Sequence, residues 1–197
     1  MVNNCRNYFA LDEACRSGQK RHVWNTTKTD AAFKDGCRAL GEVVYFFQQL
    51  EGDLREAVAF LTDPCDGSSV NIVVCELSFK QLINLASSLL PLFAIKEKQK
   101  AIKEWREILL AAQKAEEHRN RILHSTFAVS LDEHPVFVRT KRTAKFRKGF
   151  QENGECLDPK TMEKYRHEIG NVATRIVDFM GRTFPGWHVR QWSPNRP

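Results

Sequence analysis

Apolar residues recur every three or four positions along most of this chain, which is the spacing of one face of an α-helix. The first such stripe follows Asp30, a favourable N-cap residue, and stops at the loop-forming run TDPCDG. The stripe predicts a long helix over about residues 30–61. Its members are Phe33, Cys37, Leu40, Val44, Phe47, Leu54, Val58 and Leu61.

Three more helices follow from the same spacing. The second covers residues 79–90 and ends at Pro91, since proline cannot continue a helix. The third begins near Lys96, and the fourth begins at Asp158 and Pro159, a good N-cap followed by a good first helical residue. The apolar stripes of the third and fourth helices include Ile102, Trp105, Leu109 and Ala112, and Met162, Ile169, Val172, Ile176, Val177 and Met180.

Two segments depart from the helical period. TFAVS and VFVRTKR alternate apolar and polar residues on either side of LDEHP, which predicts a β-hairpin within about residues 126–150. NIVVCEL, residues 71–77, fits either a short strand or the lead-in to a helix. The chain is therefore expected to be mainly α, a four-helix bundle with a small hairpin insertion before the last helix.

The same patterns set the expected domain limits. The bundle occupies residues 30–181, preceded by an irregular arm over 1–29 and followed by a tail over 182–197. A length of 197 residues with 42% hydrophobic residues suits a single globular unit.

Cysteine usage and hydropathy bear on compartment. No two cysteines have the short spacing of a zinc site, and scattered thiols are typical of a cytoplasmic protein without a metal or cofactor. We find neither a signal peptide nor a membrane span, because the most apolar stretch, LINLASSLLPLFAI, is interrupted by polar residues and proline. The cysteines are Cys5, Cys15, Cys37, Cys65, Cys75 and Cys156.

Positive charge is concentrated in one segment. RTKRTAKFRK, residues 139–148, contains six basic residues and no acidic one, and six is the whole excess of Lys and Arg (30) over Asp and Glu (24). A basic strip that includes an aromatic residue suits a polyanion such as RNA, although short basic tracts are often only solvated. The candidate RNA-binding residues are Arg139, Lys141, Arg142, Lys145, Arg147 and Lys148.

A second chemical feature closes the third helix. An Arg followed by a His four to six residues later occurs three times in the chain, but the matches from Arg16 and from Arg182 enclose glycine or proline. Only RNRILH, with Arg119, Asn120 and His124, lies on a predicted helix.

RNRILH resembles the motif of the HEPN superfamily, whose ribonuclease members carry an Arg, a polar residue and then a His on a small helical bundle. The resemblance covers about residues 30–181 and implies a metal-independent endoribonuclease with Arg119, Asn120 and His124 as catalytic residues. It also implies a role in phage defence, toxin–antitoxin control or a stress response, with an antitoxin or defence-system partner.

The chemistry agrees with the residue types. Cleavage needs a group that takes the proton of a 2′-hydroxyl, a group that protonates the leaving 5′-oxygen, and a cation for the phosphate. Histidine exchanges protons near neutral pH, and arginine grips two phosphate oxygens with a planar fork. Asn120, four positions before His124, is placed to orient the imidazole or the substrate.

Helical geometry and the resemblance together suggest a dimer. Five residues at about 100° each would separate Arg119 and His124 by about 140° around one helix. The resemblance implies that two protomers pair so that their motifs form one composite site across a two-fold axis. Glu116 either favours the histidine cation or pairs with Arg119, while His118 is expected at the surface.

One position departs from the family pattern. Where toxins silenced by a nucleotidyltransferase partner carry a Tyr two residues after the His, this chain has Thr126. That form of antitoxin control is therefore in doubt. A non-catalytic module that binds RNA, a nucleotide or a protein, and a dimerisation scaffold with cations at a helix end, stay open as alternatives.

Overall fold

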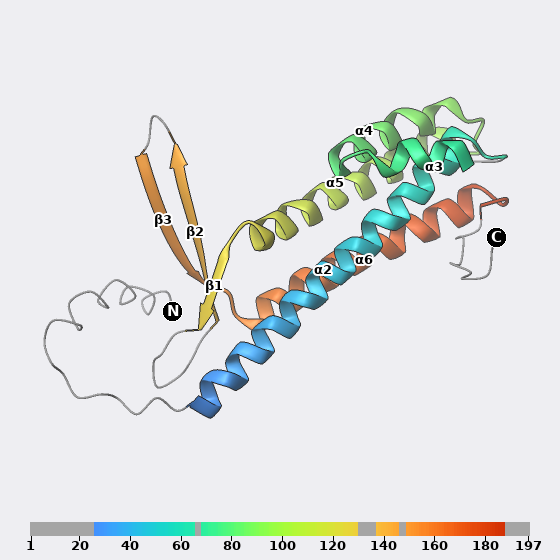
Figure 1. Ribbon diagram of the computed structural model, residues 1–197. Helices are drawn as coiled ribbons and strands as arrows, with labels where there is room; N and C mark the ends of the chain where they lie inside the picture. Colours follow the sequence, from blue (N-terminus) through green and yellow to red (C-terminus); the bar gives the residue numbers. More distant parts are fainter. Residues whose placement is uncertain (1–25, 66–67, 130–136, 146–148, 188–197) are drawn as a thin grey trace, which may run out of the picture. The chain divides into compact units, whose positions relative to one another are not determined.

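The computed structural model describes residues 26–65, 68–129, 137–145 and 149–187 (Figure 1). These residues form mainly helix with a small antiparallel sheet before the last helix, which confirms the predicted fold class. The elements are α2 Thr26–Thr62, α3 Ser68–Cys75, α4 Phe79–Leu89, the 3-10 turn η2 Leu90–Leu92, α5 Lys98–Leu123, β1 Thr126–Val129, β2 Phe137–Lys145, β3 Gly149–Cys156 and α6 Pro159–Thr183.

The chain divides into two compact units, and each unit is built from two separate segments of the chain. Unit 1 takes the described residues of Met1–Gly41 and Arg121–Glu163, which include the sheet. Unit 2 takes Glu42–Asn120 and the described residues of Lys164–Pro197, which form the helical bundle.

The sheet of unit 1 has three strands in the order β1-β2-β3 rather than the two of the expected hairpin. β2 is central, pairing with β1 from Val129↔Phe137 to Thr126↔Thr140 and with β3 from Val138↔Cys156 to Lys145↔Gly149. The third strand contains ENGEC, whose Asn-Gly pair suggests a turn when it is considered alone. Pairing with β2 along eight positions outweighs that local preference.

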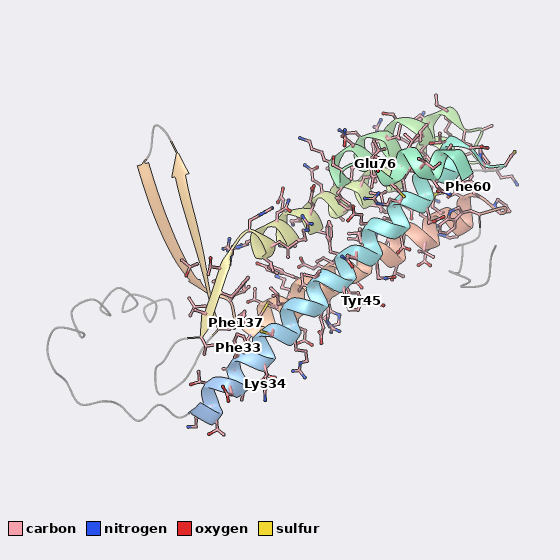
Figure 2. The ribbon with its side chains drawn as sticks, viewed as in Figure 1. Phe33, Lys34, Tyr45, Phe60, Glu76 and Phe137 are labelled. Atoms are coloured by element: carbon pink, nitrogen blue, oxygen red, sulfur yellow. The ribbon has the colours of Figure 1, made fainter. Side chains whose placement is uncertain are left out.

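A glycine allows α2 to approach this sheet. Gly36 is buried, and a Cβ atom built there would overlap the ring of Phe137 on β2, which is labelled in Figure 2. Phe137 in turn stacks on Phe127 of β1, with ring centroids 5.1 Å apart. The glycine therefore supplies the space into which an aromatic side chain of the sheet packs.

Trp105 organises the core of unit 2. Its indole is 1% exposed and stacks on Phe179 of α6 at 4.8 Å between centroids. Its Nε1 donates a hydrogen bond of 3.0 Å to the carbonyl of Ala86 on α4. One side chain of α5 thus contacts two neighbouring helices, and its polar atom has the partner that burial requires.

The segment that fits either strand or helix in the sequence is helical, as α3. Arg55 of α2 holds the end of this short helix, donating to the carbonyls of Val74 at 3.0 Å and Cys75 at 2.6 Å. The same guanidinium pairs with Glu51 at 2.6 Å. A cation at a helix C-terminus satisfies carbonyls that have no partner within the helix.

Helix ends agree with the sequence in some places and not in others. α4 begins with a full capping box, because Ser78 accepts from the backbone N–H of Gln81 and the Gln81 side chain accepts from Ser78. Asp158 caps α6 as predicted, accepting from the N–H of Thr161 at 2.6 Å. The N-cap predicted at Asp30 is wrong, since α2 begins at Thr26.

The predicted stripe on α2 is correct only in its second half. Phe47, Leu54, Val58 and Leu61 are buried, but Phe33 is 53% exposed and Cys37 is exposed too. The buried side of α2 in unit 1 passes instead through Gly36, one turn from Phe33. The proposed arm over 1–29 loses residues 26–29 to α2, and residues 1–25 lie outside the described residues.

The tail contributes at least one buried side chain. Trp187 is buried, and its backbone N–H bonds the carbonyl of Phe184 at 2.9 Å. The ring of Phe184 lies 5.4 Å from that of Phe60 on α2. The remainder of the predicted tail, residues 188–197, is outside the described residues.

The carboxyl of Asp53 has an unusual electrostatic setting. Burial, with a smaller contribution from the nearby charge of Glu56, raises the pKa of Asp53 to about 6. The unfolded chain has the ordinary value of 3.8, so the folded state binds the proton more tightly. This group therefore favours the folded state most below pH 4, and that contribution is lost as the pH rises through 6.

Substitution of the two α2 glycines of unit 1 tests the packing on Phe137. We expect Gly36→Ala to lower the free energy of unfolding by about 1–3 kcal/mol, because the ring must move. Gly41→Ala is the matched control, since a Cβ there meets nothing within 4 Å. The control is expected to gain about 0.5–1 kcal/mol from helix propensity. Urea unfolding followed by circular dichroism measures both, and equal effects would contradict the contact.

Replacement of Asp53 tests the raised pKa. At pH 7.5 we expect Asp53→Asn to be more stable than the parent by about 1 kcal/mol, because the half-buried carboxylate is partly screened by solvent. The difference should shrink as the pH falls through 6 and vanish near about pH 3, where the parent carboxyl is protonated in both states. Urea unfolding at about pH 3, 6 and 7.5 measures it. Glu107→Gln, at an exposed position of α5, is the control and should show no such gain at high pH.

Candidate functional site

The RNRILH motif lies where α5 ends, and the two units divide it. Arg119 and Asn120 are the last residues of unit 2, and His124 belongs to unit 1. α5 ends at Leu123, so His124 stands one residue beyond the helix that was expected to carry it. The angle of about 140° between Arg119 and His124 therefore does not apply, because it requires helical geometry through His124.

Arg119 is held on two sides within unit 2. Its Nη1 donates a hydrogen bond of 2.9 Å to Oδ1 of Asn120. Its guanidinium carbon lies 5.3 Å from the centroid of the Phe47 ring on α2, a cation–π distance. The side chain is half-buried, so its charged fork has a restricted set of orientations.

The partner of Asn120 differs from the sequence-based expectation. Its amide oxygen accepts from Arg119, so within unit 2 it orients the arginine. Glu116 is half-buried and, among the described residues, makes no ion pair within 4 Å. The pairing of Glu116 with Arg119 that we considered from the sequence is therefore not formed.

His118 is not the plain surface residue that the sequence suggested. Its side chain is 19% exposed, and its ring stacks on Tyr165 of α6 at 4.1 Å between centroids. Nε2 lies 3.0 Å from Oε2 of Glu168, but this buried atom has no well-aligned hydrogen bond within the described residues. The pair is therefore a close electrostatic contact between α5 and α6.

A second arginine packs on an aromatic ring in the same unit. The guanidinium of Arg166 on α6 lies 5.6 Å from the centroid of Phe46 on α2, and its Nε is 3.5 Å from Oε2 of Glu42. Sequence reasoning did not find Phe46, Glu42 or the α6 partners of His118. The run YRHE, residues 165–168, is the sequence feature that could have indicated these contacts. It places four polar or aromatic side chains together on a helix that otherwise has an apolar stripe.

His124 is exposed and lies on a very short connection. Only His124 and Ser125 separate the end of α5 from the start of β1. Ser125 Oγ donates to the carbonyl of Arg121 at 2.8 Å. The imidazole thus faces solvent from a backbone segment that secondary structure limits on both sides.

The structure divides the basic strip. Arg139 is 7% exposed, and its Nε donates to the carbonyl of Arg121 and to Ser125 Oγ, both at 2.7 Å. These internal contacts set Arg139 apart from the proposed phosphate-binding residues. Lys141, Arg142 and Lys145 lie in β2, whereas Arg147 and Lys148 lie outside the described residues.

Acidic residues of β3 lie in register with the strip. Glu155 is the Cα partner of Arg139, and Glu152 is the Cα partner of Arg142. Lys141 and Lys145 are opposite Asn153 and Gly149, which carry no charge.

Two further features of the described residues bear on ligands. None of their His, Cys, Asp and Glu side chains form a group of three or more that could hold a metal ion. No described helix is long and apolar enough to cross a membrane.

A cavity of about 470 Å³ lies in unit 2 between the start of α5 and the end of α6. Its lining includes Lys100, paired with Glu97, and Arg182, paired with Glu104.

The chain was compared with known proteins at three levels. Neither protein-family models, nor curated protein sequences, nor solved structures give a match. The geometry of the motif, the residue chemistry and the resemblance in RNRILH therefore carry the functional argument.

Proposed function

We propose that this protein is a metal-independent endoribonuclease of the HEPN type. The observation that carries the proposal is the composition and placement of RNRILH: a guanidinium fixed by Asn120 and Phe47, and, five residues later, an exposed imidazole. The two side chains supply a cation for phosphate and a proton carrier near neutral pH. These are the groups that RNA cleavage without metal requires.

The reaction assigns a role to each residue. A base removes the proton of the 2′-hydroxyl, whose oxygen forms a bond to phosphorus as the bond from phosphorus to the 5′-oxygen breaks. An acid gives a proton to that leaving oxygen, so the products are a 2′,3′-cyclic phosphate and a 5′-hydroxyl. His124 acts in proton transfer, Arg119 stabilises the phosphate charge, and Asn120 orients Arg119.

The proposal includes a homodimer with a composite site. Two proton-transfer groups are needed for one phosphate, and each chain carries a single His in the motif. A two-fold axis between protomers would supply the second one. The dimer follows from the resemblance and from this requirement, and it is tested separately below.

The strip would guide RNA to the site. Lys141, Arg142, Lys145, Arg147 and Lys148 are the proposed phosphate contacts. We further propose a cytoplasmic role in phage defence, toxin–antitoxin control or a stress response. Thr126 argues against silencing by modification of a Tyr at that position.

A second candidate is a non-catalytic module that binds RNA, a nucleotide or a protein through the same bundle. The contact of Arg119 with Phe47 favours this alternative, because an arginine that joins α5 to α2 has a structural role without any substrate. The two candidates differ in whether loss of His124 removes a chemical activity. The first experiment addresses that difference.

His124→Ala should reduce cleavage of total RNA in EDTA by at least about 100-fold, as loss of an acid–base group does. The cyclic phosphate and the 5′-hydroxyl are the ends to detect. His167→Ala is the matched control, since it removes an exposed histidine of α6 outside the motif, and it should cleave like the parent. Equal cleavage by parent and His124→Ala would remove His124 from the site, and no cleavage by the parent would favour the binding module.

Mixing the parent with an inactive variant tests the composite site. If one site needs His124 from both protomers, a dimer of one parent chain and one His124→Ala chain should be inactive. With equal parts of the two proteins, about a quarter of the dimers have two parent chains, so activity should fall to about a quarter of that of the same total amount of parent. Activity that stays at about half of that value after subunit exchange, or an obligate monomer at micromolar concentration, would contradict the composite site.

A further inference from the structure

Arg139 is unusual in its burial. Among the residues whose side chains the structure describes, it is the one charged residue that is buried, although it begins the basic strip. Burial of a guanidinium is costly unless its donors are satisfied by well-placed acceptors. The hydrogen bonds of the buried side chain therefore indicate the role of Arg139.

Those contacts surround the connection that carries His124. Nε of Arg139 lies 2.7 Å from both the Arg121 carbonyl and Ser125 Oγ, and Ser125 Oγ is 2.8 Å from the same carbonyl. Each of the three groups is thus bonded to the other two. Arg121 precedes His124 by three residues and Ser125 follows it directly, so the three bonds close a bracket around the segment 122–124.

The bracket also completes the end of α5. The last carbonyls of a helix have no partner within it, and a cation is the favoured group there. The Arg121 carbonyl is one of these, and it receives both a cation and a hydroxyl. A stop at Leu123, rather than a frayed last turn, follows from these bonds.

Strand pairing within the sheet fixes the backbone position of Arg139. Arg139 lies on the central strand, with Phe127 as its Cα partner in β1 and Glu155 in β3. Its neighbours Phe137 and Val138 are buried. All of these residues and the bracket belong to unit 1.

We propose that Arg139 is a positioning residue for His124, acting through the bracket with Arg121 and Ser125 rather than by contact with RNA. It holds the two-residue connection in one conformation, so that the exposed imidazole starts from a fixed backbone. Preorganisation of this kind matters because small displacements of a reacting group cost large factors in rate. The catalytic meaning of this role rests on the proposed ribonuclease function, but the ordering of the connection does not.

Steady-state kinetics separates positioning from RNA contact. We expect Arg139→Gln to lower kcat by about 10- to 100-fold while KM and the salt dependence of KM stay at parent values. Lys160→Gln removes the same charge from an exposed position of α6 in the same unit and is the matched control, with kcat and KM at parent values. A rise in KM with a flatter salt dependence in Arg139→Gln, or parent kinetics, would overturn the proposal.

Backbone dynamics gives a readout that needs no activity. In ¹⁵N relaxation and amide exchange, Arg139→Gln should make His124 and Ser125 more mobile than in the parent, and Lys160→Gln should not. Undiminished order at His124 in folded Arg139→Gln would overturn the proposal. If the parent cleaves no RNA, the ribonuclease function fails, yet this measurement still decides whether Arg139 orders the connection.

If Arg139→Gln does not fold, a milder variant tests the same proposal. Ser125→Ala keeps the buried cation and removes only the hydroxyl, so it should change kcat and His124 order in the same direction by about 3- to 10-fold in rate. Ser125→Thr retains the hydroxyl and should restore both. Parent order and rate in Ser125→Ala would show that the bracket does not act on His124.

Discussion

Burial of one side of α2 is the constraint on which both units depend. A helix of 37 residues cannot leave its apolar side chains in water, and its buried positions Gly36, Val43, Leu50 and Ala57 recur every seven residues. In unit 1 this side brings Gly36 against the Phe137 ring. In unit 2 it brings Phe47 against Phe79 and beneath Arg119. A rotation of α2 by one residue, about 100°, would remove all of these contacts together.

Two arginines perform the same physical task in different units. Arg55 closes the end of α3, and Arg139 closes the end of α5, each by donating to carbonyls that the helix itself cannot satisfy. Cations used in this way are not available to a polyanion. The six basic residues of the strip therefore overstate the positive charge that RNA could contact, because Arg139 is used inside the fold.

Local patterns predicted the elements that depend on local physics. α4, α5 and α6 followed from apolar spacing, with Pro91 near the end of α4 and Asp158 at the start of α6, because those signals lie within or beside the segment that they shape. β3 was missed, since its strand conformation comes from pairing with β2 and not from ENGEC itself. α3 stayed undecided because eight residues hold too few helical turns to show a period.

The candidate site shows the same limit. The residue types at Arg119, Asn120 and His124 are visible in the sequence, but their partners are not. Phe47 lies 72 positions before Arg119, and no local signal joins them. Likewise, Arg139 was predicted to bind RNA together with its basic neighbours, because its charge is visible in the sequence. Its burial depends on the fold and is not visible there.

The structural and chemical roles of Arg119 are compatible, because its structural contacts leave most of its N–H donors available. Phe47 attracts the guanidinium charge through its ring electrons and offers no oxygen or nitrogen acceptor to the N–H donors. Of the five N–H donors around the edge, the hydrogen bond to Asn120 takes one. A phosphate requires two donors from one edge, so an arginine packed on Phe47 still has enough donors for a bidentate contact. The ring and the amide then restrict the fork before substrate arrives, which lowers the entropy lost when it binds.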